Sequence, residues 1–209
     1  MSKFKNLFIF GTGQLSQLIF NLIKHDKNNG YSVKAFIDNK KKIFLGKKVF
    51  SEKDFFKVIK KKLNVVIAIG DVKIREKILK KLNKKNIFFP VINFSNTEIY
   101  NSKSIGKGTI ILPSATILPS SIIGKFCIIG TGVKILHHVK IGSNCVLGGG
   151  TLVGSNVKLD DNVSVGVGSV FASKKILIGK YSVICAGSVV LKDVKKFQKV
   201  LGNPARLIL

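Results

Sequence analysis

The chain has 209 residues, of which 45% are apolar, and its 36 Lys and Arg against 10 Asp and Glu give a formal net charge of +26. This length allows one large domain or two small ones, each with a hydrophobic core. No window approaches the roughly 18 consecutive apolar residues of a membrane-spanning helix, and the N-terminus lacks the features of a secretory signal. We therefore expect a cytoplasmic protein without membrane insertion.

The positive charge is spread in a way that argues against nucleic-acid binding. Lysine neutralises phosphates and releases counterions, so a basic chain invites that hypothesis. Here, however, the lysines form short runs at 40–42, 60–62 and 84–85, without interleaved aromatic residues or a recognised binding motif. We expect no nucleic-acid partner, but a lysine-rich surface that attracts smaller polyanions over long range.

The first part of the chain alternates strands and helices. An apolar run at 5–10 ends in Gly11, and apolar residues then recur at helical spacing. Further strands are expected at 32–37 and 65–69, and a helix follows the last of these through Leu82. This order predicts a small Rossmann-like α/β domain with a parallel sheet, whose ligands bind beyond the carboxyl ends of the strands.

Small and polar residues stand at these strand ends. The first strand is followed by Gly11-x-Gly13-x-x-Ser16, an incomplete form of the dinucleotide fingerprint. The second ends at Asp38, where an acidic side chain commonly meets a ribose hydroxyl or another polar ligand group. A tight strand-to-helix turn that needs glycine is the structural alternative. With Gly70 after the third strand, the three ends predict one ligand crevice.

The remainder of the chain has a six-residue period. An apolar residue stands at every sixth position from Ile99 to Val189, and glycine often follows it. After Phe171 the phase slips by one residue, which predicts an extra residue in a loop at 172–175. A period of six with a small residue at each bend fits neither a flat strand nor a helix and predicts a β-solenoid with three units per coil. The two domains are expected at 1–93 and 94–209.

Several motifs together carry a family resemblance: FGTG at 10–13, FIDN at 36–39, AIGD at 68–71, HHVKIG at 137–142, ICAGSVV at 184–190 and GNPA at 202–205. The repeat resembles the left-handed parallel β-helix of the hexapeptide acyltransferases. Nearly the whole chain is similar to the bacterial nucleotide-aminosugar N-acetyltransferases of bacillosamine, perosamine and viosamine synthesis, which are relatives of the sialic-acid O-acetyltransferases.

This resemblance implies an acetyl-coenzyme A-dependent N-acetyltransferase that acts on a nucleotide-linked amino sugar, such as a 4-amino-4,6-dideoxy sugar. The product would serve surface glycan, lipopolysaccharide or O-antigen biosynthesis. The resemblance also implies a homotrimer with coenzyme A in the groove between neighbouring β-helices, and no metal ion.

Acetyl transfer to an amine needs a base that takes up a proton, and histidine is the natural choice. His25 ends the first expected helix and is expected to be exposed, whereas His137 and His138 interrupt the repeat. In the resembled family the catalytic histidine heads the pattern His-x-x-x-Ile-Gly, which His137 matches. We therefore predict His137 as the general base, with His138 in the place of the usual acidic neighbour. Two surface histidines on a coil are the alternative.

The resemblance also implies the binding residues. It places the nucleotide sugar in the crevice of the first domain, with its amine reaching His137 of a neighbouring subunit, and coenzyme A along the coils. The implied substrate residues are Gly11, Gly13, Gln14, Asp38, Asn39 and Gly70, and the implied cofactor residues are Val146, Val167, Ala186 and Gly187. Val146 replaces a second histidine of many members, and a β-helix corner needs small residues such as Ala186 and Gly187 in any case.

Two other functions remain alternatives at this point. The first is an O-acetyltransferase of a sialic acid or another sugar hydroxyl, and the second is a non-catalytic β-solenoid that binds polyanions through its lysines. For the main interpretation, dTDP, UDP and GDP are all candidates for the nucleotide, as are C3 and C4 for the amino group.

Overall fold

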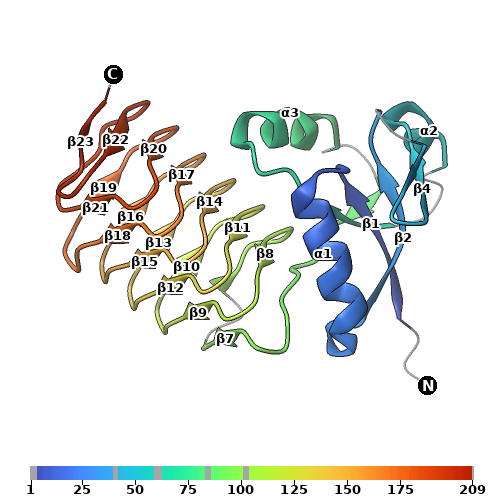
Figure 1. The fold of residues 1–209 in the computed structure, drawn as a ribbon, viewed down its shortest axis with the longest axis horizontal. Helices are drawn as coiled ribbons and strands as arrows, with labels where there is room; N and C mark the ends of the chain where they lie inside the picture. Colours follow the sequence, from blue (N-terminus) through green and yellow to red (C-terminus); the bar gives the residue numbers. More distant parts are fainter. Residues whose placement is uncertain (1–3, 40–41, 59–62, 83–85, 101–103, 209) are drawn as a thin grey trace. The chain divides into compact units, whose positions relative to one another are not determined.

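The computed structural model describes residues 4–39, 42–58, 63–82, 86–100 and 104–208. The chain divides into two compact units, Met1–Ser95 and Asn96–Leu209, so the division falls two residues after the expected end at residue 93. Figure 1 shows an α/β unit with blue to green elements and a unit of stacked coils coloured green to red.

The first unit contains a six-stranded sheet of order β3-β4-β2-β1-β5-β6. All its neighbouring strands are parallel except the β3-β4 hairpin, which is antiparallel. The strands are β1 (Lys5–Phe10), β2 (Tyr31–Ile37), β3 (Ile43–Phe44), β4 (Lys47–Phe50), β5 (Leu63–Ile67) and β6 (Ile87–Phe88). The helices are α1 (Gln14–His25), the short 3-10 helix η1 (Lys27–Asn29), α2 (Glu52–Val58) and α3 (Val72–Leu82).

Helices cover both faces of this sheet. The ring of Phe20 on α1 lies 5.8 Å from that of Phe36 on β2, and the ring of Phe55 on α2 lies 5.7 Å from that of Phe8 on β1. Phe36 pairs with Ile9, the neighbour of Phe8, and successive side chains of a strand point to opposite faces. α1 and α2 therefore pack on opposite faces of the sheet.

The sequence pattern missed the elements between the second and third expected strands. The β3-β4 hairpin and α2 occupy Ile43–Phe44, Lys47–Phe50 and Glu52–Val58, where lysines interrupt the apolar periodicity. Of the three lysine runs, residues 40–41, 60–62 and 84–85 lie outside the described residues, and Lys42 is exposed.

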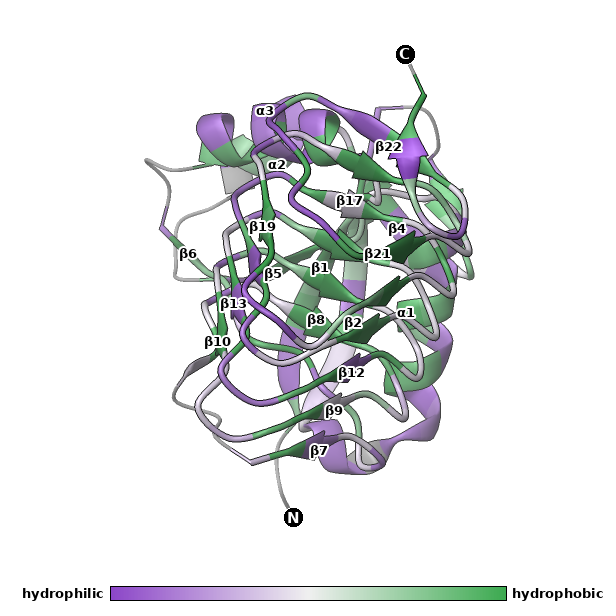
Figure 2. Ribbon diagram, turned by 90° about the vertical axis from the view of Figure 1, so that its left-hand side faces the viewer, coloured by the Kyte–Doolittle hydropathy of each residue, from purple (hydrophilic) through white to green (hydrophobic). Residues whose placement is uncertain are grey.

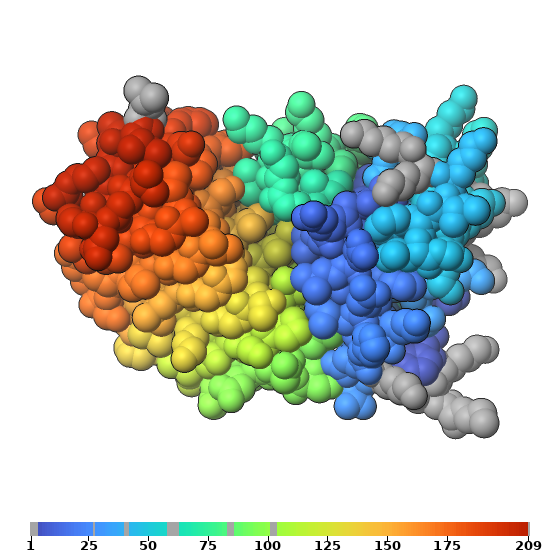
Figure 3. All heavy atoms as spheres, in the orientation of Figure 1, coloured from blue at the N-terminus to red at the C-terminus, as the bar shows by residue number. Residues whose placement is uncertain are grey.

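The second unit is a β-helix whose short strands form three sheets, of four, seven and six strands. Ile135 pairs with Ile117 before it and with Val153 after it, a spacing of 18 residues in each direction. Three six-residue units therefore make one coil, as predicted, and Figure 3 shows the coils stacked as successive bands of colour.

The strands of the first sheet are β10 (Ile122–Ile123), β13 (Lys140–Ile141), β16 (Lys158–Leu159) and β19 (Leu177–Ile178). Those of the second are β8 (Ile110–Ile111), β11 (Ile128–Ile129), β14 (Val146–Leu147), β17 (Ser164–Val165), β20 (Val183–Ile184), β22 (Lys199–Leu201) and β23 (Arg206–Leu207). Those of the third are β7 (Glu98–Ile99), β9 (Thr116–Ile117), β12 (Lys134–Ile135), β15 (Leu152–Val153), β18 (Val170–Phe171) and β21 (Val189–Val190).

The apolar residues that recur about every six positions, which we call the apolar ladder, form the core of the β-helix. From β8 to β22, the second residue of each coil strand is buried, and many of these strands are largely green in the hydropathy view of Figure 2. At about 1.5 to 3 kcal/mol for each buried aliphatic side chain, the ladder offsets much of the ordering cost of the coils. The glycine that follows many of these apolar residues is needed for close stacking of the coils. A Cβ on Gly148, for example, would lie 2.5 Å from the backbone nitrogen of Val167 on the next coil.

The phase slip after Phe171 is confirmed. Lys158 pairs with Leu177, which is a spacing of 19 residues, and the loop between β18 and β19 holds the extra residue. As a result Leu177 is 41% exposed while Ile178 is fully buried.

The cysteines lie in the β-helix, and Cys127 and Cys145 are buried while Cys185 is partly exposed. The neighbouring Cys127 thiol, and secondarily burial, raise the pKa of Cys145 well above its usual value, so this thiol stays protonated. The Cys127 thiol donates to the carbonyl oxygen of Gly142, and the Cys145 thiol to that of Asp160, each at 3.1 Å.

Candidate active site

The carboxyl ends of β1, β2 and β5 meet at one edge of the sheet. The backbone nitrogen of Gly11 donates to the carbonyl of Ile37 at 2.8 Å, and that of Ala68 donates to the carbonyl of Phe10 at 2.9 Å. The Thr12 hydroxyl donates to Oδ2 of Asp38 at 2.8 Å, which joins the glycine turn to the end of β2. The structure thus brings the predicted Gly11 and Asp38 together.

Gly11 has a positive φ of 106°, and a Cβ there would lie 3.1 Å from the carbonyl oxygen of Ala68. This glycine therefore serves the tight turn itself. Gly13 has open space beside it and is the N-cap of α1, where no side chain caps the helix and no acidic residue stands in the first turn. The N-terminus of a helix presents backbone N–H groups and a positive dipole, so the start of α1 at Gln14 favours an anion.

Asn39 and Gly70 have structural partners in the same region. Oδ1 of Asn39 accepts a hydrogen bond from the backbone nitrogen of Glu52 at 3.0 Å and so helps to start α2. Gly70 lies in the loop after β5, and Nη1 of Arg75 donates to the carbonyl oxygens of Ile69 at 2.5 Å and of Gly70 at 3.2 Å.

Arg75 was missed by the sequence analysis. It is only 1% exposed, although it stands in a helix whose other polar residues face solvent. The signal was its place in the buried series of α3 with Ile78 and Leu82. Its guanidinium fixes the loop that carries Gly70.

A cavity of about 560 Å³ in the first unit lies away from this crevice. It is bounded by α1, β2 and the β3-β4 hairpin, and its lining includes Phe20, Lys24, Tyr31 and Lys47 but none of the predicted substrate residues. Burial raises the pKa of the Tyr31 phenol.

His137 and His138 lie in the turn between β12 and β13, and both are exposed. Nδ1 of His137 is 2.9 Å from Nδ1 of His138, and Nε2 of His137 is 3.0 Å from the hydroxyl oxygen of Ser155 on the next coil. Both nitrogens of the His137 ring thus have a partner, so the ring has one orientation. His138 has a φ of 60° and takes one of the positive-φ positions that recur at the bends of the coil.

Each of the two contacts needs one proton, and the tautomer of the His137 ring decides which of its nitrogens donates. A neutral imidazole has one donor and one acceptor nitrogen. When His137 donates from Nδ1 to His138, its Nε2 accepts from Ser155 and is the nitrogen that can take up a further proton. The arrangement suits a general base that acts through Nε2.

The predicted cofactor residues lie on other parts of the β-helix. Val146 is half-buried on β14, in the second sheet. Val167, Ala186 and Gly187 line one edge of the coil, together with Gly150, and Val167 is 60% exposed. We call this edge the glycine corner; its positive-φ glycines are Gly132, Gly150, Gly168 and Gly187. Apart from atoms of the glycine itself and its two chain neighbours, no heavy atom lies within 4 Å of the Cβ position of any of them.

The structure does not bring this glycine corner to His137 within one chain. The third sheet separates the glycine corner from the edge of the β-helix that carries His137. In the coil of His137, for example, β12 lies between Gly132 and His137. Five residues of extended chain span roughly 16 Å. A single β-helix therefore presents His137 at one edge of the third sheet and Val167, Ala186 and Gly187 at the other edge, with Val146 on β14 in the second sheet.

Among the described residues, no three His, Cys, Asp or Glu side chains gather closely enough to hold a metal ion. Over the same part of the chain, no helix has both the length and the apolar character needed to cross a membrane.

Family models match both units of the chain. Residues 6–82 match the PglD N-terminal domain, and residues 102–137 and 120–155 match the bacterial transferase hexapeptide repeat. The chain thus carries a PglD-type N-terminal domain followed by bacterial transferase hexapeptide repeats. The predicted family, fold class and transferase character are thereby confirmed.

Solved structures of similar fold span the whole of this transferase. The acetyltransferase domain of PglB from Neisseria gonorrhoeae has a TM-score of 0.88 and 19% identity, over 98% of this chain and 100% of that one. A histidine-to-alanine mutant of GDP-perosamine N-acetyltransferase from Caulobacter crescentus, in complex with CoA and GDP-perosamine, has a TM-score of 0.88 and 22% identity, over 99% and 98%. WeeI from Acinetobacter baumannii has a TM-score of 0.70 and 24% identity, over 98% and 100%. No curated protein sequence matches the chain significantly.

Proposed function

We propose that this hexapeptide-repeat transferase is an acetyl-coenzyme A-dependent N-acetyltransferase acting on a nucleotide-linked amino sugar. The observation that carries the proposal is a β-helix with a held histidine base, His137, in a chain whose α/β unit presents Asp38 at the carboxyl ends of its strands. Proteins of the same fold were solved with CoA and GDP-perosamine or with acetyl coenzyme A, which supports both proposed substrates.

The first unit would hold the nucleotide sugar. The N-terminus of α1 at Gly13 and Gln14 suits the diphosphate, because its N–H groups and dipole favour negative charge. The carboxylate of Asp38, already oriented by Thr12, can accept a hydrogen bond from a hydroxyl of the ligand. Gly11, Asn39 and Gly70 would shape the crevice through their backbone rather than through free side chains.

His137 would take part in the transfer of the acetyl group. The amine nitrogen of the sugar forms a bond with the thioester carbonyl carbon and loses a proton, which Nε2 of His137 takes up. The carbon–sulfur bond then breaks, and the same proton leaves with the coenzyme A thiol. His138 would hold the ring through its contact with Nδ1 of His137.

Acetyl-coenzyme A fits the glycine corner. The missing side chains of Gly150, Gly168 and Gly187 leave open space in which a pantetheine chain can approach the backbone, and Val167 and Ala186 lie in the same edge. Because His137 and this edge lie on opposite sides of one sheet, we propose a homotrimer in which the glycine corner of one chain faces His137 of the next. Threefold closure repeats this contact identically.

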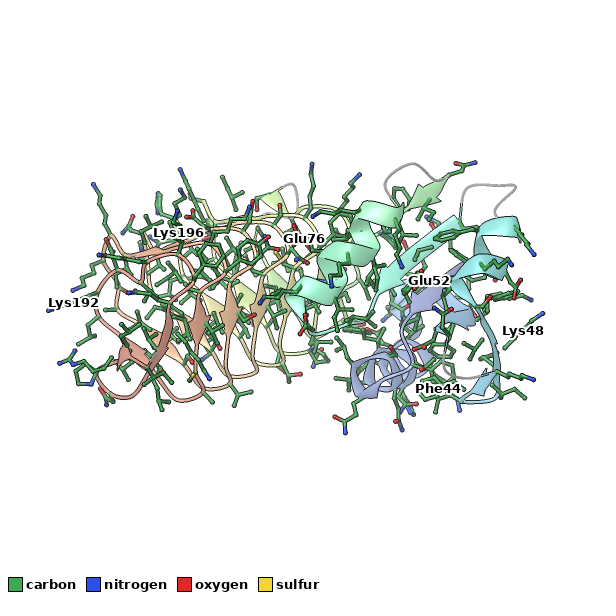
Figure 4. The ribbon with its side chains drawn as sticks, turned by 90° about the horizontal axis from the view of Figure 1, so that it is seen from above. Phe44, Lys48, Glu52, Glu76, Lys192 and Lys196 are labelled. Atoms are coloured by element: carbon green, nitrogen blue, oxygen red, sulfur yellow. The ribbon has the colours of Figure 1, made fainter. Side chains whose placement is uncertain are left out.

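The O-acetyltransferase remains the second candidate, since the same base could deprotonate a sugar hydroxyl. Lysines such as Lys192 and Lys196 are exposed on the last coils (Figure 4); their charge can attract polyanionic substrates over long range and does not by itself favour a non-catalytic polyanion binder over a transferase. We favour the amine because the structures of similar fold that contain both substrates contain an amino sugar nucleotide.

The test is incubation with acetyl-coenzyme A and a panel of GDP-, dTDP- and UDP-linked 3-amino and 4-amino sugars, read by mass for one added acetyl group. The proposal expects one amino sugar to be acetylated far faster than its hydroxyl analogue. Acetylation of the hydroxyl analogue alone would establish the O-acetyltransferase instead. No acetylation, together with salt-sensitive binding of DNA or RNA, would favour the polyanion binder. The product's use in surface glycan synthesis is part of the proposal.

A further inference from the structure

We propose that the hydroxyl of Ser155 is a catalytic group that passes the proton of the acceptor to Nε2 of His137. This inference rests on the proposed acetyl transfer but goes beyond it, because it assigns the proton's path to a residue that no sequence motif marks.

Ser155 is held rigidly beside the base. It is 6% exposed, and its backbone nitrogen donates to the hydroxyl of Ser173 on the following coil at 3.2 Å. The preceding Gly154 has no room for a side chain, because its Cβ would lie 2.5 Å from the carbonyl oxygen of Phe171. The stacking of the coils thus sets the 3.0 Å contact between the Ser155 hydroxyl and Nε2 of His137.

This contact occupies the nitrogen that must act as the base. Nδ1 of His137 already faces Nδ1 of His138, so the ring cannot offer that side to an acceptor without losing its orientation. Direct proton uptake at Nε2 would require the Ser155 bond to break. Transfer through the hydroxyl requires no such rearrangement, since a hydroxyl is both a donor and an acceptor.

The step balances without another reactant. As the amine nitrogen bonds to the thioester carbon, its proton moves to the Ser155 oxygen while the Ser155 proton moves to Nε2 of His137. When the carbon–sulfur bond breaks, the proton on Nε2 returns to Ser155, and the Ser155 proton goes to the departing sulfur.

The same contact resembles a nucleophile with its base, but the surroundings disfavour an acyl-serine intermediate. The adjoining backbone N–H groups are already used: that of Ser155 by Ser173, that of Gly154 by Phe171, and that of Asn156 by the carbonyl of His137. None of these three is left to stabilise an oxyanion formed on Ser155. A relay of protons needs no such group.

The experiment compares Ser155→Ala and Ser155→Thr with the wild type on the amino sugar nucleotide that is turned over fastest. We expect Ser155→Ala to lower kcat by about 10- to 100-fold, with both KM values within about twofold, and Ser155→Thr to restore most of the rate. Ser143→Ala is the matched control: its hydroxyl makes the same kind of contact, accepting from the backbone nitrogen of Lys125 at 3.2 Å, but at another edge of the coil, so the rate should stay within about twofold.

A second measurement needs no variant. In mixtures of H2O and D2O, a relay moves two protons together, so the dependence of wild-type kcat on deuterium fraction should be curved; a linear dependence would contradict the relay. Wild-type activity with an equally active Ser155→Ala would overturn the relay but leave the proposed function standing. An acetyl group found on Ser155 by mass spectrometry would replace the relay with a nucleophile. An inactive wild type would overturn both proposals.

Discussion

Replacing Gly166 with alanine tests how tightly the coils are stacked. A Cβ at this position would lie 2.4 Å from the backbone nitrogen of Ala186 and 2.7 Å from its Cα, and both atoms belong to the backbone of the next coil. No side-chain rotation can relieve these contacts. Ordinary contacts of a Cβ begin near 3.4 Å, so the two coils would have to move apart by about 1 Å.

That movement would break a backbone hydrogen bond between the two coils. The backbone nitrogen of Gly166 donates to the carbonyl of Ile184 at 2.7 Å, and 1 Å more would exceed the usual range of about 2.7 to 3.2 Å. An unmade buried hydrogen bond costs about 1 to 3 kcal/mol, and overpacking costs a similar amount. Gly166→Ala should therefore lower the free energy of unfolding by about 2 to 6 kcal/mol.

The assay is urea unfolding followed by circular dichroism, with Gly168→Ala as the matched control. Gly168 also lies in this coil, but its Cβ position is open, so alanine there meets only the cost of a positive φ, about 1 to 2 kcal/mol. Equal destabilisation by the two variants, or a Gly166→Ala protein as stable as the wild type, would refute the close stacking of the coils.

Three further predictions concern the base, the crevice and the end of α1. His137→Asn should lower kcat by about 100- to 10,000-fold without changing the thermal midpoint, measured as thiol release from acetyl-coenzyme A in the presence of acceptor; an unchanged rate would remove His137 from the chemistry. Asp38→Ala should raise the KM for the nucleotide sugar about tenfold and leave that for acetyl-coenzyme A unchanged, while Thr12→Val, which removes the same internal hydrogen bond but keeps the carboxylate, should have a smaller effect. The Ser95 hydroxyl, followed by backbone N–H groups, lowers the pKa of Asp26 below its ordinary 3.8, so this carboxylate stabilises the fold above that pH and the contribution is lost as the pH falls through the lowered pKa. Urea unfolding between pH 5 and pH 2.5 should therefore be less pH-dependent for Asp26→Asn, and equal slopes would contradict the assignment.

The sequence was most informative where one periodicity ran through many residues. The apolar ladder predicts the coils and the slip after Phe171. Each sixth side chain must point to the axis of the β-helix and be apolar, so an added residue shifts the apolar positions by one. The β3-β4 hairpin and α2 were missed because elements of two to seven residues with several lysines leave no clear period. Short elements of this kind are fixed by tertiary contacts.

The candidate site was predictable in its residue types but not in its contacts. His137 could be chosen from its motif, but its link to Ser155 joins residues 18 positions apart and becomes visible only when the coils are stacked. The burial of Arg75 could not be predicted for a related reason. A buried arginine needs carbonyl groups as partners, and the carbonyl oxygen of Ile69 is identified as a partner only in the folded structure. Asn39 illustrates the reverse case, because the structure gives this predicted ligand residue a role in starting α2.

The most direct test of the proposed function is the chemical nature of the bond that the enzyme makes. The wild type is incubated with acetyl-coenzyme A and a nucleotide-linked 4-amino-4,6-dideoxy sugar, and the acetylated product is treated with alkaline hydroxylamine, which cleaves oxygen esters but leaves amides intact. We predict a product that gains one acetyl group in an enzyme-dependent reaction and keeps it under hydroxylamine. Loss of the acetyl group under hydroxylamine, or no enzyme-dependent acetylation of any amino sugar nucleotide, would contradict the proposed N-acetyl transfer.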